Sequence, residues 1–216
     1  MRVSRLIAVA NRPEQSSINC LHFIVYNYYI TDWLIDMEYP VVLKDFISAS
    51  DAELVISFID QLHRDGKLHH SSMENGIDGR NLIWNPDDKE AIELIKKYTK
   101  KVIEAQGENL DVFIHVCGFY KYEKNSGMGP HSDIMNEGCS KCILSAVLYF
   151  NDEYLGGELF FPKLNKEFRM PARSVAFYPA HLPQYDHGVR EITSGVRYAI
   201  PMCFTTDFSR SPQYYN

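Results

Sequence analysis

The sequence predicts a mainly β fold with flanking α-helices, in which a sandwich or jelly roll of short strands forms the core. Helical periodicity ends near Gly107, and the rest of the chain alternates short apolar runs with clusters of Gly, Pro, Asn and Asp. The aromatic share of 13%, with 14 tyrosines, also favours strands over a helical bundle. Helices that precede many short strands are typical of helices packed outside such a core.

The composition limits the class of protein. With 216 residues, 45% of them hydrophobic and 23% charged, the chain can form one domain with a substantial core, and a mostly disordered chain is excluded. The net charge of −6 provides no broad basic face for nucleic acid. Because no repeat or linker divides the chain, we expect one domain over residues 37–216, preceded by an N-terminal extension or extra strand layer over residues 1–36.

The apolar segments near the N-terminus are too short for secretion or membrane insertion. Residues 6–10 fall below the roughly 7 apolar residues of a secretory core, and residues 20–35 fall below the roughly 20 that span a bilayer. The five cysteines, an odd number, do not match a secreted disulfide framework. We therefore expect a cytoplasmic protein without a membrane partner.

Two helices are predicted before the strands. In the first, Ser50 and Glu53 fit a capping box, and apolar residues follow at helical spacing: Leu54, Val55, Phe58 and Leu62. The second covers residues 85–107, with Asn85 as its cap, Pro86 in its first turn and Gly107 past its end. Its apolar stripe consists of Ala91, Ile95, Tyr98 and Val102.

The apolar runs after Gly107 predict strands, because they are too short for helices and are bounded by turn residues: 112–122, 142–150, 158–161, 174–178 and 196–204. In the last run, the two-residue period places Arg197 on one face with small and apolar neighbours: Ala199, Pro201 and Cys203. A guanidinium in such surroundings needs a carboxylate, supplied either by an internal Asp or Glu or by a ligand.

Two histidines and one aspartate are candidates for a metal site. In His131-Ser132-Asp133 an extended backbone would point the imidazole and the carboxylate to the same side, although a lone loop His paired with Asp fits the same pattern. His187 follows 54 residues after Asp133, and His181 is the alternative third residue. Two His and one carboxylate form the facial arrangement of non-haem Fe(II) oxygenases.

These residues carry a resemblance to a known family. Residues 112–206 resemble the 2-oxoglutarate- and Fe(II)-dependent dioxygenases, and within them the prolyl 4-hydroxylase-like group. The matching features are, in order, Tyr122 nine residues before His131, the run 148–152 leading to 156–162, and His187 ten residues before Arg197. Residues 40–47 and the helix after them resemble the entry to that domain, so the resemblance covers most of the chain from about Met37.

The resemblance implies a double-stranded β-helix, a cupin-like jelly roll, and assigns roles to six residues. The iron ligands would be His131, Asp133 and His187, and Arg197 would bind the C5 carboxylate of 2-oxoglutarate. Tyr122 would place its hydroxyl against the same co-substrate, and Ser145 stands where a Thr commonly lines that pocket. Fe(II), 2-oxoglutarate and O2 are the implied cofactor and co-substrates, with ascorbate as an accessory reductant.

Two departures from the family pattern affect the expected substrate. Arg197 replaces the Lys of many prolyl hydroxylases, and Met128 replaces a frequent aromatic residue three positions before the first His.

Halogenating relatives carry Gly or Ala where Asp133 stands, so hydroxylation is expected. We expect the substrate to be a prolyl or similar side chain in a peptide or protein, and leave open a free amino acid or natural product. A non-catalytic, metal-holding cupin-like binding module is the alternative from another class.

Two further features have weaker interpretations. Cys139 and Cys142 have the spacing of a zinc or redox pair, but no second pair follows at matching spacing. The polar, Gly-containing segment 66–84 is expected to be a mobile loop at the cleft. In that segment Arg80 and Trp84 are candidates for substrate contact, with a core position as the alternative for the tryptophan.

Overall fold

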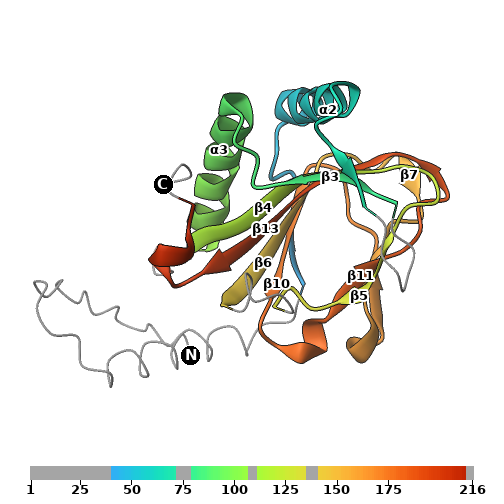
Figure 1. The fold of residues 1–216 in the computed structure, drawn as a ribbon. Helices are drawn as coiled ribbons and strands as arrows, with labels where there is room; N and C mark the ends of the chain where they lie inside the picture. The colour runs from blue at the N-terminus through green and yellow to red at the C-terminus, as the bar shows by residue number, and fades with distance from the viewer. Residues whose placement is uncertain (1–39, 72–78, 107–110, 135–140, 213–216) are drawn as a thin grey trace, which may run out of the picture. The chain divides into compact units, whose positions relative to one another are not determined.

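The computed structural model describes residues 40–71, 79–106, 111–134 and 141–212 (Figure 1). The predicted extension 1–36, Cys139 and part of the predicted loop 66–84 lie outside these ranges. Within the described ranges, no helix has the length and apolar character needed to cross a bilayer.

The core consists of two sheets that face each other, as the predicted jelly roll requires. The major sheet has the strand order β1-β10-β6-β13-β4-β3-β2, and the minor sheet has the order β5-β11-β8-β9. Strands of the major sheet are β1 Val41–Leu43, β2 His69–His70, β3 Asn81–Trp84, β4 Phe113–Tyr122, β6 Cys142–Tyr149, β10 Ser174–Pro179 and β13 Arg197–Thr205. The minor sheet contains β5 Met128–His131, β8 Leu159–Phe161, β9 Lys166–Phe168 and β11 His187–Val189, and a small ribbon pairs β7 Tyr154–Leu155 with β12 Ser194–Gly195.

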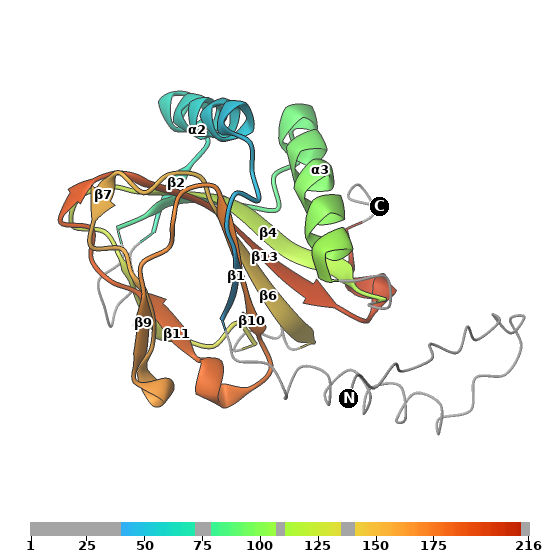
Figure 2. The same ribbon diagram turned by 180° about the vertical axis from the view of Figure 1, so that it is seen from behind.

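The five predicted strand segments are confirmed as β4, β6, β8, β10 and β13. Helices α2 (Ala49–Arg64) and α3 (Lys89–Gln106) lie over the outer face of the major sheet (Figure 2). On this face Phe58 of α2 packs edge-to-face on Phe119 of β4, and the Tyr198 hydroxyl of β13 donates to Asp60 of α2 at 2.9 Å. The strands are apolar on both faces because one face meets the helices and the other lines the interior.

Both predicted helix starts are wrong by a few residues. The first helix is capped by Ser48, whose hydroxyl accepts a hydrogen bond from the Asp51 amide at 3.1 Å, while the Ser50 hydroxyl pairs with that of Ser48 at 3.2 Å. The buried stripe of α2 is centred on Ala52, Val55, Ile59 and Leu62, which leaves the predicted core residue Leu54 50% exposed.

The second helix begins at Lys89, four residues after its predicted cap. Asp88 accepts a hydrogen bond from the Ala91 amide at 3.0 Å, which is the bond of an N-terminal cap. Asn85 has instead a left-handed backbone, with φ of 41°, and its side-chain oxygen accepts from the Cys117 amide at 3.0 Å. Asn85 therefore links the end of β3 to β4 through this hydrogen bond. The predicted stripe of α3 is buried as expected.

Candidate active site

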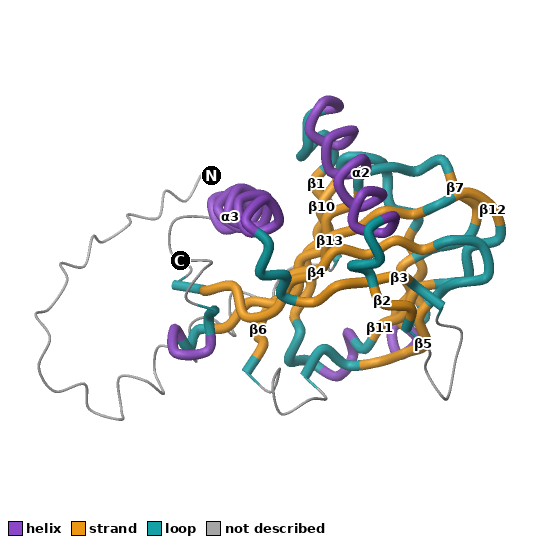
Figure 3. The backbone as a smooth tube through the Cα atoms, turned by 45° about the horizontal axis from the view of Figure 1, so that its top comes forward, coloured by secondary structure: helices purple, strands orange, loops and turns teal. Residues whose placement is uncertain are grey.

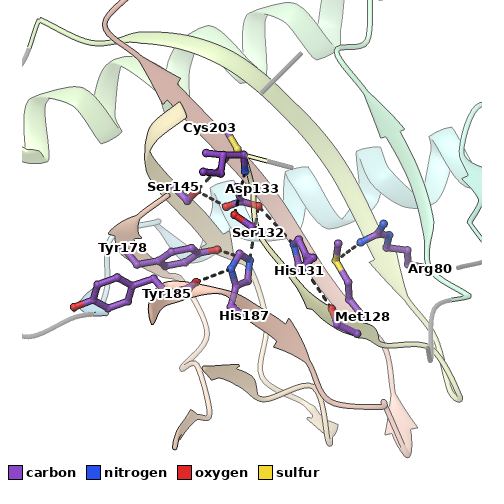
Figure 4. Close-up of polar contacts among 12 residues, drawn as sticks. Arg80, Met128, His131, Ser132, Asp133, Ser145, Tyr178, Tyr185, His187 and Cys203 are labelled. Atoms are coloured by element: carbon purple, nitrogen blue, oxygen red, sulfur yellow. Dashed lines mark hydrogen bonds and ion pairs between the residues drawn. The ribbon is translucent and has the colours of Figure 1, made fainter. Parts of the chain in front are cut away.

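Strand pairing brings the two candidate histidines together from distant parts of the chain. His187 of β11 is directly opposite His131 of β5 in an antiparallel pair, and the two ring centroids are 4.4 Å apart. Figure 4 shows both rings turned toward Asp133. Asp133 lies in the turn after β5, two residues beyond His131, so the strand ends before the carboxylate that the sequence analysis placed on it.

The three side chains form one cluster with converging donor atoms. Oδ1 of Asp133 lies 3.5 Å from Nε2 of His131 and 3.9 Å from Nε2 of His187, and the three candidate ligand atoms all lie within 4.8 Å of one another. His181, the alternative, contacts the Ile143 carbonyl through Nδ1 at 2.9 Å and is not part of this cluster.

The hydrogen bonds of both imidazoles fix the nitrogen that faces the cluster. Nδ1 of His131 donates to the Gly129 carbonyl at 3.1 Å, and Nδ1 of His187 donates to the Tyr185 carbonyl at 3.2 Å (Figure 4). With Nδ1 engaged by a carbonyl, each ring presents Nε2 to the cluster, where this nitrogen is available to bind a cation. Such carbonyl partners are the usual means of orienting a histidine that binds a metal.

The electrostatics favour the protonation states that a metal requires. Burial lowers the pKa of His187 to about 4, so the imidazole is neutral at physiological pH. Burial alone would raise the pKa of Asp133, but the two imidazoles and the hydrogen bond from Ser145 hold it below its ordinary value. Two neutral imidazoles and one carboxylate match the donor set of an Fe(II) site, so the residues present fit this ion.

The other end of the interior contains Arg197, which is 2% exposed. Its guanidinium lies over the rings of Tyr122 and Tyr149, at 4.6 and 4.9 Å from their centroids. Burial alone would lower the pKa of Arg197, but the surrounding tyrosine hydroxyls raise it above its ordinary value. The internal ion pair that the sequence left open is not formed with any carboxylate of the described ranges.

Several buried polar atoms around Arg197 have no partner among the described residues: Nε and Nη1 of Arg197 and the hydroxyls of Tyr149 and Tyr154. Buried polar groups are nearly always hydrogen-bonded, and a guanidinium accepts a carboxylate with two parallel bonds. The orphaned donors therefore fit the C5 carboxylate of 2-oxoglutarate.

One cavity of about 390 Å³ joins the two ends and is lined by all six residues singled out in the sequence. The structure places Ser145 at the metal end, where its hydroxyl donates to Asp133 and lies 3.9 Å from Sγ of Cys203. Two further tyrosines line the cavity, Tyr149 and Tyr178, and a third, Tyr154, lies near Arg197. The Tyr178 hydroxyl lies 3.0 Å from Nε2 of His187.

Comparison with known proteins agrees with this geometry. Residues 117–205 match the family model of the 2OG-Fe(II) oxygenase superfamily, a range that includes all six predicted site residues. The chain is 30% identical over 178 residues to a PKHD-type hydroxylase of Prochlorococcus marinus (strain AS9601), covering 79% of this chain and 74% of that one. The chain belongs to the 2OG-Fe(II) oxygenase superfamily. This oxygenase is a 2-oxoglutarate-dependent hydroxylase, and family membership implies Fe(II), 2-oxoglutarate and O2.

Solved structures share the fold of this oxygenase at low sequence identity. A prolyl hydroxylase of Trichoplax adhaerens, in complex with a hypoxia inducible factor peptide fragment, superposes with a TM-score of 0.65 at 17% identity, covering 90% of this chain and 96% of that one. The 2OG complex of a viral collagen prolyl hydroxylase from Paramecium Bursaria Chlorella virus-1 gives a TM-score of 0.58 at 16% identity, covering 78% and 97%. The predicted jelly-roll fold is thereby confirmed.

Proposed function

We propose that this oxygenase hydroxylates an unactivated C–H bond of a prolyl or similar side chain in a peptide or protein. The observation that carries the proposal is the pairing, in one cavity, of a His-Asp-His cluster with a buried arginine whose donors lack partners. A metal-holding binding module needs no second site for a dicarboxylate. The hydroxylase relatives also favour turnover over binding alone.

His131, Asp133 and His187 would hold Fe(II) through two Nε2 atoms and one carboxylate oxygen. Fe(II), when bound, supplies the redox chemistry by which 2-oxoglutarate and O2 become succinate and CO2 while one oxygen atom enters the substrate. Arg197 would bind the C5 carboxylate in a fork, with the hydroxyl of Tyr149 beside it and the Tyr122 ring below. Ser145 would hold the Asp133 carboxylate in place through its hydrogen bond.

The peptide part of the proposal has support from the fold neighbours, and hydroxylation has support from Asp133. The Trichoplax enzyme was solved with a peptide fragment, which makes peptides the first substrates to test. A carboxylate fills the position that halogenating relatives leave to chloride, so hydroxylation is the expected outcome.

The test is turnover by the full chain supplied with Fe(II), 2-oxoglutarate and, in parallel assays, proline-containing peptides or free amino acids. We expect succinate release together with a peptide mass gain of one oxygen atom. Oxidation of a free amino acid but of no peptide would overturn the proposed substrate, and a chlorinated or desaturated product would overturn hydroxylation. Ascorbate is proposed as an accessory reductant, so its omission should shorten the period of linear turnover.

A further inference from the structure

Trp84 is an exposed aromatic side chain at the catalytic cavity. Four large hydrophobic residues of the described ranges are exposed: Leu54, Trp84, Leu155 and Phe208. Trp84 is 42% exposed and is the member of this group that also lines the cavity, together with His131, Asp133 and His187. Ligand sites are commonly lined by aromatic side chains, so the place of Trp84 in the cavity lining makes it a candidate for substrate contact.

The position of Trp84 is fixed by the strand that carries it. The next residue, Asn85, donates from its backbone amide to the Cys117 carbonyl at 2.8 Å and accepts from the Cys117 amide at 3.0 Å. These two bonds hold the end of β3 against β4, which lies beside it in the sheet (Figure 3). The tryptophan is therefore carried by a paired strand.

The indole lies over a glycine of the neighbouring strand. Trp84 pairs with Gly118, and a Cβ added at Gly118 would lie 3.0 Å from Cε3 of Trp84 and 2.7 Å from the Ile83 carbonyl oxygen. The indole also packs edge-to-face on Tyr120, with ring centroids 5.0 Å apart. The absence of a side chain at Gly118 thus makes room for the indole, which lines the cavity.

Sheet topology gives the backbone spacing between Trp84 and Ser145, the residue of the major sheet that contacts the metal end. Trp84 lies on β3 and Ser145, which donates to Asp133, lies on β6, three strands away across β4 and β13. Three strand spacings of about 4.8 Å separate the two backbones by ~14 Å across the sheet. One residue of extended chain advances only about 3.5 Å, so contact with both the metal end and Trp84 favours a substrate of several residues over a free amino acid.

We propose that Trp84 is a docking surface for the substrate peptide, and that it stacks on a proline or similar apolar residue near the one that is hydroxylated. This inference rests on the proposed peptide substrate. Proline-rich segments in the polyproline II conformation bind to aromatic grooves because their conformation is already ordered. Loss of one such contact should weaken peptide binding about tenfold.

The test compares Trp84→Ala and Trp84→Phe with Phe208→Ala, a matched control in which an exposed aromatic residue outside the cavity loses an edge-to-face contact of 5.0 Å with Phe113. Substrates are proline-rich peptides of about three and about ten residues that carry the target proline at one end. We expect Trp84→Ala to raise KM for the long peptide about tenfold and to leave KM for the short peptide within about twofold. Trp84→Phe should keep most of the affinity, and Phe208→Ala should match the wild type.

A direct binding signal is available because the chain has two tryptophans. In a Trp33→Phe variant, Trp84 is the remaining tryptophan, and its fluorescence should change on titration with the long peptide. Equal KM values for Trp84→Ala and Phe208→Ala, with the long peptide still hydroxylated, would overturn the docking surface alone. A change in oligomeric state with unchanged peptide KM would also overturn it, while hydroxylation of no peptide would overturn the proposed function together with this inference.

Discussion

The two ends of the cavity use opposite arrangements of buried polar groups. At the metal end, Asp133 accepts from Ser145 and faces two imidazoles whose remaining N–H groups are bonded to carbonyls. At the other end, Arg197 lies between aromatic rings, and several of its neighbouring donors lack partners among the described residues. The first end is organised before a cation binds, whereas the second end has an unmet requirement for an anion. Mutations at the two ends should therefore have different consequences.

The largest effect is expected at the metal end. Asp133→Ala removes the charged member of the donor set, so iron should no longer bind stoichiometrically and succinate formation should fall below about one-hundredth, since even outer partners of metal ligands contribute 10–100-fold. Iron content after reconstitution and succinate release measure this. His181→Ala, which changes a histidine outside the cluster, should retain both. Normal iron binding and turnover in Asp133→Ala would place the metal elsewhere.

At the anion end, Arg197→Ala should leave iron bound and raise the required 2-oxoglutarate concentration by about two to three and a half orders of magnitude. Breaking a buried charged pair costs about 3–5 kcal/mol, and each 1.4 kcal/mol is a factor of ten. Arg190→Ala removes an arginine at the surface, where it pairs with Glu167 at 2.9 Å, and should change the requirement little. An unchanged 2-oxoglutarate affinity in Arg197→Ala would remove this residue from the site.

A mutation of Ser145 tests which end of the cavity its hydroxyl serves. The family resemblance assigns its hydroxyl to the co-substrate, whereas the structure shows it bonded to Asp133. We expect Ser145→Ala to weaken iron binding about 10–100-fold, with a smaller effect on 2-oxoglutarate affinity at saturating iron. Ser174→Ala alters a buried serine that donates to the Pro171 carbonyl, and serves as the control. A larger effect on 2-oxoglutarate than on iron would support the co-substrate role.

An effect on folding instead of on binding is expected at alkaline pH. Burial raises the pKa of Tyr149 to about 12, above the ordinary value of 10. Because the folded state favours the neutral phenol, its contribution is complete below pH 10 and is lost as pH rises through the folded-state pKa, by at most about 2–3 kcal/mol. Urea unfolding at several alkaline pH values should show a steeper loss of unfolding free energy in the wild type than in Tyr149→Phe. Equal slopes would contradict this assignment.

The parts of the site that depend on short-range spacing could be predicted from the sequence. His131 and Asp133 are two residues apart, so almost any local backbone keeps them close. His187 rather than His181 lies in the cluster, because His187 is the residue that pairs with β5. The tyrosines around Arg197 could not be assigned in the same way. Tyr149 meets Arg197 through the pairing of β6 with β13, and one sequence does not reveal which face of β6 is the inner one.

The fold was predictable to the extent that its elements are long. The long strands and both helices have clear apolar patterns, whereas β5, β11 and β12 have two to four residues, too few for a period to appear. The helix starts were misplaced because Ser48 and Ser50 are chemically equivalent caps, as are Asn85 and Asp88. In each pair, contacts with the sheet determine which residue begins the helix, and such contacts are not visible in the local sequence.

The central position of β13 has one further consequence. This strand carries Arg197 at one end and Cys203 beside Ser145 toward the other, and it pairs along its length with both β4 and β6. The separation between the anion end and the metal end is thus set by a ladder of backbone hydrogen bonds. A slip of one residue along β13 would move the guanidinium by about 3.4 Å and turn it toward the helices. The register of β13 therefore determines which length of keto acid can contact Arg197 and the metal end at the same time.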